Sequence, residues 1–149
     1  MNIQEAIEFI RTTSSQTRIY VGCDSTVRSC RGVQKVTYAT VVVVHIDGSR
    51  GCRVFGQIET VREYGPLKQR LFNEALRAGD MAFQILPHVG GRELEVHLDI
   101  NRDANCASHI AVKEAAAYIM GLLGFQPKFK PDAPVATGCA DRFASVAPV

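Results

Sequence analysis

Residues 18–46 read RIYVGCDSTVRSCRGVQKVTYATVVVVHI, with an apolar segment on either side of a basic one. The first segment, residues 18–24, is a compact apolar run that ends in an aspartate. Residues 36–46 are the most strongly β-branched part of the chain, which favours a strand. The basic segment between them, residues 25–35, is expected to be an irregular loop. The stretch therefore predicts two neighbouring strands, the first of which ends at Asp24.

The flanking sequence extends this pattern in both directions. A turn signal at residues 47–49 joins the second strand to a third at residues 52–60, which predicts an antiparallel meander. Apolar residues at helical spacing predict a short extra helix ahead of the meander, at residues 3–10. After the meander we expect a helix at about 67–86, a strand at 93–101, a helix at 107–123, a short edge strand within 125–130 and a last helix at about 132–145. Helices that connect later strands imply crossovers, so the fold class is α/β with a mixed five-stranded sheet flanked by helices.

The composition is that of an ordinary folded protein with 149 residues, 46% of them hydrophobic and 21% charged. These values support a packed core and exclude a disordered chain, and we expect a single domain over residues 1–149. The net charge is only +2, so overall charge neither requires nor excludes a nucleic-acid partner. Any basic surface must be local.

The cysteines and the N-terminus point to an intracellular protein. The five cysteines are an odd number, and no two have the spacing of a zinc site. The first residues lack the apolar run of a signal peptide. No apolar run approaches the roughly 20 residues of a membrane span, so no membrane partner is expected. We therefore expect free thiols in the reducing cytoplasm.

Two strands of the predicted sheet end with an aspartate. In each strand the apolar side chains alternate with a second face, on which Asp24 and Asp99 lie. If the strands pair in parallel, the carboxylates meet near their C-terminal ends, where open α/β sheets bind ligands. Either aspartate alone has an ordinary explanation as a turn residue or as part of the wet face of a sheet. Together, in this order of elements, they favour a site for Mg²⁺ or Mn²⁺, since a divalent cation removes the repulsion between carboxylates.

Three more acids are candidates. Glu74 lies in the middle of a predicted helix and would by itself be taken for a solvated residue, although that helix could present it to the same metals. Arg70, one turn earlier, can pair with Glu74. Asp132 lies where the last helix is expected to begin, which also suits a simple N-cap. Asp141 follows further along that helix, as an acid that could equally be a surface residue.

At these residues the sequence resembles the YkuK-like family of ribonuclease-H-like proteins. The matching stretches are YVGCDS at 20–25, YATVV at 38–42, RLFNE at 70–74, HLDIN at 97–101, and GF at 124–125 leading into KPDA at 130–133. They run in the order of the family over nearly the whole chain. The resemblance implies a ribonuclease H-like fold with catalytic, metal-binding acids at Asp24, Glu74, Asp99 and Asp132. Asp141 is similar in position to the final-helix acid of ribonuclease H, and we favour Asp132 because it lies within the matching stretch.

Several polar residues around these acids are accessory candidates. His97 shares a strand face with Asp99 and could contact a phosphate or move a proton, although such a histidine is more often structural. The other accessory candidates are Ser25, Asn101 and Lys130. Basic residues around the first two turns could neutralise phosphates, or could be ordinary solvated charge: Arg28, Arg31, Lys35, Arg50 and Arg53.

Two functions remain open on this sequence. The first is a divalent-metal-dependent nuclease that hydrolyses DNA, RNA or their hybrid by a two-metal mechanism. The second is a non-catalytic ribonuclease-H-like module that binds nucleic acid or a protein partner. The joint presence of four acids favours the first. An enzyme that acts on a four-way junction would in addition have to be a two-fold homodimer.

Overall fold

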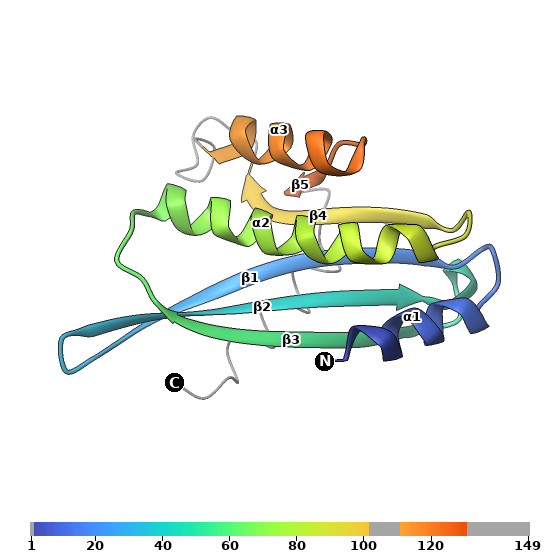
Figure 1. Ribbon diagram of the computed structural model, residues 1–149, viewed down its shortest axis with the longest axis horizontal. Helices are drawn as coiled ribbons and strands as arrows, with labels where there is room; N and C mark the ends of the chain where they lie inside the picture. Colours follow the sequence, from blue (N-terminus) through green and yellow to red (C-terminus); the bar gives the residue numbers. More distant parts are fainter. Residues whose placement is uncertain (1, 102–110, 131–149) are drawn as a thin grey trace.

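The structure is a computed structural model that describes residues 2–101 and 111–130 (Figure 1). The elements are, in order, α1 (Ile3–Thr12), β1 (Arg18–Cys30), β2 (Val33–His45), β3 (Cys52–Arg62), α2 (Leu67–Ile85), β4 (Glu93–Asn101), α3 (Val112–Leu123) and β5 (Lys128–Lys130), with short 3-10 turns at Ile46–Gly48 and Leu86–His88. The predicted elements are thus confirmed over the described range. The segment 102–110 and the expected last helix lie outside it.

The five strands form one mixed sheet in the order β3-β2-β1-β4-β5. β1 pairs antiparallel with β2, and β2 pairs antiparallel with β3, as the predicted antiparallel meander requires. β1 pairs in parallel with β4, and β4 pairs in parallel with β5. β1 is therefore the central strand, and the parallel half of the sheet begins at its other side. The α/β fold class with a mixed sheet and an extra N-terminal helix is confirmed.

One hydrophobic core lies between the sheet and the three helices, and Figure 1 shows α2 crossing in front of the sheet. The predicted core face of β1 is confirmed, because Ile19, Val21 and Cys23 are fully buried in this core. Val96 and Leu98 of β4 are buried in the same core. The alternate residues of both strands therefore face the other side of the sheet. Among the described helices, none is long and apolar enough to cross a membrane.

The expected irregular loop at residues 25–35 is wrong. β1 runs on to Cys30 and β2 begins at Val33, and the two strands stay in register as far as this pair. The turn between them is Arg31-Gly32, with φ of 51° and 77°. A two-residue turn with both φ values positive fits the twist of a hairpin, but it usually announces itself as Asn-Gly or Asp-Gly. The turn was not predicted because its first residue is an arginine. The outer parts of β1 and β2 were not predicted as strands because many of their side chains are polar.

α2 and α3 pack closely at Gly79, the glycine in the middle of α2. A Cβ atom at this position would lie 2.8 Å from Cδ1 of Ile119 and 3.0 Å from Cε2 of Tyr118. The absence of a side chain therefore lets the two helices approach. Gly124, with φ of 84°, ends α3 as the sequence predicts, because it adopts the left-handed conformation of a helix C-cap.

Candidate functional site

The candidate site lies where β1 and β4 separate. Their parallel register runs from the pair Arg18 and Glu93 to the pair Cys23 and Leu98. Asp24 and Asp99 are the next residues on the two strands, so the expected arrangement on adjacent parallel strands is present. The register between β4 and β5 shifts between Leu98 and Asn101, which marks an irregularity at the same place. Asp24 is 8% exposed, although it stands at the end of the parallel pairing.

Ser25 connects the aspartate of β1 to the helix above it. Its backbone N–H donates a hydrogen bond of 2.8 Å to Oδ1 of Asp24. Its hydroxyl donates to Oε2 of Glu74 on α2. Successive residues of a strand point to opposite faces, so Ser25 lies on the helix side and Asp24 on the other. The backbone N–H of Ser25 therefore bonds the acid of β1, and its hydroxyl bonds the acid that α2 supplies on the helix side.

Glu74 is buried, at 3% exposure, in the middle of α2. The sequence taken by itself favoured a solvated position, and this interpretation is wrong. Burial follows from the helix face, since Leu71, Ala75 and Ala78 around it pack into the core. The second carboxyl oxygen of Glu74, Oε1, is buried and has no hydrogen-bond partner within the part of the chain that the structure describes.

The surroundings of Glu74 favour its neutral form. Burial raises its pKa well above the usual range, and the negative charges of Asp24 and Asp99 raise it further. The hydrogen bond from Ser25 and the positive charge of Arg70 act in the opposite direction. Asp24 and Asp99 are therefore close enough to Glu74 to influence its ionisation. A cation among them would reverse the balance and favour the ionised carboxylate.

Arg70 is the residue near these acids whose part the sequence understated. It lies one helical turn before Glu74, where the sequence indicates that the two side chains could pair. The charge of Arg70 acts on Glu74, but none of the ion pairs found among the described residues joins the two side chains. Its Nε is buried without a hydrogen-bond partner in that same part of the chain. A buried guanidinium donor beside the acids is a natural ligand for an anionic group.

His97 is buried on the strand face that also holds Asp99, with 3% exposure. Its Nε2 lies 2.9 Å from a carboxyl oxygen of Glu95, and its ring lies 4.9 Å from the ring of Tyr20. Nδ1 is buried, with no hydrogen-bond partner in the described ranges. These contacts fix the orientation of the ring. They are compatible both with a structural histidine and with one that meets a ligand through Nδ1.

The remaining predicted residues divide into two groups. Asn101 and Lys130 are register partners at the ends of β4 and β5. Asp132 and Asp141 lie outside the described residues, so the choice between them stays a prediction. Cys23 is confirmed as a core residue, since it is fully buried and its sulfur accepts a hydrogen bond of 3.6 Å from Thr40. Burial also raises the pKa of its thiol, which is unfavourable for a nucleophile.

The donor set suits a hard divalent cation, because it consists of carboxylates. Within residues 2–101 and 111–130, however, no three histidine, cysteine, aspartate or glutamate side chains form a group that could hold a metal ion. Glu74 is directed to Ser25 in this state, which leaves Asp24 and Asp99 as the pair at the strand ends. A metal could be held by these two with water and a phosphate, and more firmly with a further acid from beyond Lys130.

Comparison with known proteins gives one match. A family model described as Ribonuclease H-like matches residues 2–145 of the chain. The match covers both strands that supply the aspartates, α2 with Glu74, and the segment with Asp132 and Asp141. No curated protein matches the chain, and no solved structure matches it.

Proposed function

The chain belongs to the ribonuclease H-like family, and from this membership we propose that it is a metal-dependent nuclease that hydrolyses phosphodiester bonds of DNA or RNA. The family links the fold to nucleic acids. The reaction itself, the metal and the substrate are our proposal. The proposed ligands of Mg²⁺ or Mn²⁺ are Asp24, Glu74 and Asp99, completed by Asp132.

The observation that carries the proposal is the state of Glu74. A carboxyl group that is buried, has one oxygen without a partner among the described residues and lies near two other acids is costly for a protein to maintain. A purely structural position would gain stability from an apolar residue or an amide. A divalent cation offsets the cost, since it neutralises the three carboxylates together and gives Oε1 of Glu74 a partner.

Each residue then has a definite task. Bound metal ions would activate the attacking water and stabilise the leaving oxygen. Asp24 and Asp99 would hold the charge at the strand ends, and Ser25 would keep Glu74 near them through its hydrogen bonds to Asp24 and Glu74. Arg70, with its buried Nε, is positioned to bind a non-bridging oxygen of the scissile phosphate. His97 is held by Glu95 and would contact the substrate through Nδ1.

A second function is favoured by a different observation. Because no complete group of three ligands is formed among the described residues, the chain could instead be a non-catalytic module that binds nucleic acid or a protein. The two functions differ in cleavage, not in binding. A module without catalysis would bind nucleic acid but would not cleave it, whether Asp24 is charged or neutral.

The experiment is a cleavage assay on a hybrid, a duplex, a four-way junction and a single strand, each with Mg²⁺ and with Mn²⁺. Asp24→Asn should retain the fold and lower cleavage by at least about a hundredfold, because metal stabilisation of the transition state is worth several kcal/mol and each 1.36 kcal/mol is tenfold. Its binding should be unchanged or tighter, since a carboxylate no longer repels the phosphate. Asp132→Asn should act like Asp24→Asn, and Asp141→Asn should do far less.

The controls separate the possible outcomes. Asp80→Asn removes the same charge from an exposed position on α2 and should cleave like the wild type. Equal cleavage by the wild type and Asp24→Asn, purified in the same way, would place the activity in another site or in a contaminant. Binding without cleavage by either protein would establish the non-catalytic module.

A further inference from the structure

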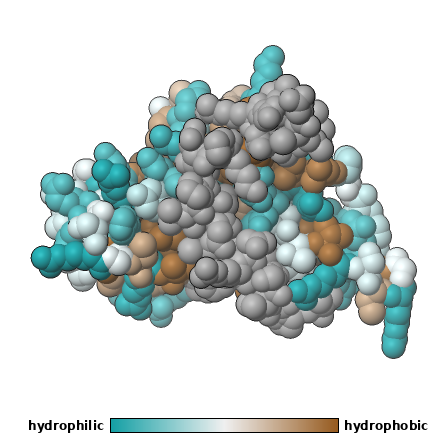
Figure 2. Space-filling model, turned by 180° about the vertical axis from the view of Figure 1, so that it is seen from behind, coloured by the Kyte–Doolittle hydropathy of each residue, from teal (hydrophilic) through white to brown (hydrophobic). Residues whose placement is uncertain are grey.

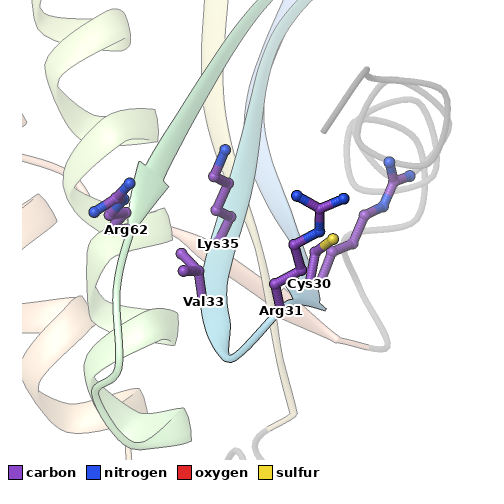
Figure 3. A pocket seen from close by; sticks show the side chains of 6 residues that line it. Cys30, Arg31, Val33, Lys35 and Arg62 are labelled. Carbon is purple, nitrogen blue, oxygen red and sulfur yellow. The ribbon is translucent and has the colours of Figure 1, made fainter.

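A basic hollow lies at the tip of the β1–β2 hairpin, the part of the sheet that extends beyond the helices in Figure 1. Its volume is about 300 Å³. It is lined by Arg28, Cys30, Arg31, Val33, Lys35 and Arg62 (Figure 3). Four of these six side chains are cationic. Viewed from behind the helices, the described surface at this tip is largely hydrophilic (Figure 2, right side).

The cations come from three strands and share one face of the sheet. Arg28 is the register partner of Lys35, and Lys35 is the register partner of Arg62. Register partners point to the same face, so three positive charges stand in one row across β1, β2 and β3. The sequence missed Arg62, because nothing along the chain indicates that it lies opposite Lys35. Only the pairing of β2 with β3 reveals the row.

The row of like charges is unfavourable for the folded protein by itself. Directly opposed like charges on a sheet destabilise it. Among the described residues, no ion pair involves Arg31, Lys35 or Arg62. At the opposite end of the sheet, Arg18 of β1 pairs with Glu93, and Arg50 ahead of β3 pairs with Asp47. Arg31, Lys35 and Arg62 thus lie together around the hollow at the hairpin tip with no ion pair among the described residues, which favours an anionic ligand.

The hollow is aligned with the candidate site. Alternate residues of a strand share a face, so Arg28 lies on the same face of β1 as Asp24. The two are four residues apart, which at about 3.3 Å per residue places them about 13 Å apart along the strand. A nucleic-acid duplex rises about 3.4 Å per nucleotide in each strand, so the two places would be about four nucleotides apart.

We propose that this hollow binds a backbone phosphate of the nucleic acid whose scissile bond lies at Asp24 and Asp99. The inference rests on the proposed function, and it adds a second contact that fixes the direction of the substrate along β1. Val33 and Cys30 also line the hollow and offer uncharged contacts for a sugar, beside the cations that bind the phosphate. An acidic membrane would present a flat surface. The hollow instead lies further along β1 from Asp24, where a nucleic-acid strand bound at the candidate site could reach it.

The test uses Lys35→Gln, the central cation of the row, with Arg18→Gln as its matched control. Each change removes one positive charge from β1 or β2, but Arg18 lies at the other end of the sheet. Binding of fluorescent duplex and hybrid oligonucleotides is measured without divalent metal over a range of salt concentrations. Lys35→Gln should weaken binding and lower the slope of log K against log salt by about 1, while Arg18→Gln should change neither.

Stability distinguishes a binding role from a structural one. Lys35→Gln relieves the repulsion within the row, so the variant should be at least as stable as the wild type while it binds less well. Arg31→Asn gives a second such variant, because asparagine is favoured at the positive φ of this turn and also removes a cation. The double variant Arg31→Asn and Lys35→Gln should bind roughly tenfold more weakly at low salt.

Several results would overturn the inference. Binding by the double variant with the affinity and salt dependence of the wild type would do so, even if Asp24→Asn abolishes cleavage. Absence of oligonucleotide binding by the wild type would overturn it as well. If the wild type instead bound acidic phospholipid vesicles, the ligand of the hollow would be a membrane surface and not a nucleic acid. If the double variant binds more weakly than the wild type but neither protein cleaves, the hollow still binds phosphate and only the proposed nuclease activity is rejected.

Discussion

At the scale of single residues, Ser25 has the most informative position in the structure. It follows Asp24 on β1, and its two donors serve acids from two different elements. From the sequence, Ser25 was predicted to be only an accessory residue. The structure shows why it matters. Without its hydroxyl, Glu74 would be a buried carboxyl group with neither oxygen hydrogen-bonded by the described residues.

Glu74→Gln should stabilise the metal-free protein, and the gain should grow as pH rises. The pKa of Glu74 is raised in the folded protein, whereas in the unfolded chain it lies near 4.3. Above about pH 4.3 the unfolded chain therefore releases a proton that the folded protein retains, so stability falls with rising pH until the folded pKa is passed. Glutamine resembles the neutral form and avoids this loss. We expect a gain of about 1 kcal/mol or more near neutral pH, because an imperfectly satisfied buried group costs about 1–3 kcal/mol.

The measurement is urea unfolding in the presence of a chelator, at several pH values from 5 to 8. Glu8→Gln is the control, since it changes an exposed glutamate on α1 and should leave the pH dependence unaltered. A loss of stability in Glu74→Gln that is the same at every pH would contradict the electrostatic explanation. It would indicate that Glu74 makes an essential contact that the amide cannot reproduce.

The candidate site was predictable in part, for physical reasons that differ among its residues. The strict alternation around Asp99 and the apolar run before Asp24 fix the face and the strand end of both aspartates. Glu74 has the helical spacing of a core residue but the chemistry of a surface residue, and spacing and chemistry conflict. Its burial depends on Leu71, Ala75 and Ala78 meeting the sheet, which is a property of the tertiary structure.

At the scale of secondary-structure elements, the hairpin of β1 and β2 differs most from the expectation. Local sequence predicts a strand where apolar and polar residues alternate against a core. Toward its tip the hairpin extends beyond the helices (Figure 1), so residues 29–32 are exposed and the alternation against a core is lost there. Cross-strand pairing as far as Cys30 and Val33 maintains the strands there. Pairing of this kind lies between segments and is not encoded in either segment alone.

The contact of α2 with α3 leads to a prediction with an internal control. Gly121→Ala changes an exposed glycine within α3 that has open space around it, so it should stabilise by about 0.5–1 kcal/mol. Gly79→Ala gains the same helix propensity but places a methyl group 2.8 Å from Ile119. Because overpacking costs about 1–3 kcal/mol, the variant should be less stable than Gly121→Ala by at least about 1 kcal/mol.

Chemical denaturation of the two glycine variants and the wild type tests this prediction. The comparison cancels the change in the unfolded chain, since both variants replace glycine by alanine within a helix. Equal stabilisation by the two changes would mean that Ile119 and Tyr118 move aside at no cost. In that event the packing of the two helices would be looser than the close approach at Gly79 indicates.

At the scale of the whole molecule, the topology brings together acids that lie far apart in sequence. β1 is central because β2 pairs with one of its sides and β4 with the other. Asp24 and Asp99 meet through the parallel pair, and α2 crosses over both strands with Glu74. The order of elements predicted this arrangement, since a strand that follows a crossover helix returns parallel to its neighbour. The order of the elements does not predict where the parallel pairing of β1 and β4 ends, which is at Cys23 and Leu98.

Divalent metal should stabilise the whole fold if the acids bind it. A ligand that binds only the folded state adds about 2.7 kcal/mol at a hundred times its dissociation constant. For a domain of this size that corresponds to a rise in Tm of roughly 5–10 °C with Mg²⁺ or Mn²⁺. Chelation should reverse the rise, Asp24→Asn should abolish it and Asp80→Asn should retain it. Thermal unfolding without nucleic acid measures the effect, and an unchanged Tm in the wild type would contradict metal binding in the absence of substrate.

The central position of β1 also matters while the protein is being made. The ribosome delivers β1, β2 and β3 first, and their hairpin pairs form between neighbours in the chain. The side of β1 that receives β4 remains an open strand edge until Asn101 has emerged, and such edges are places where nascent chains aggregate or meet chaperones. Asp99 joins Asp24 only at this last step. A half-made chain therefore lacks the paired acids, and the candidate site can form only after β4 has been made.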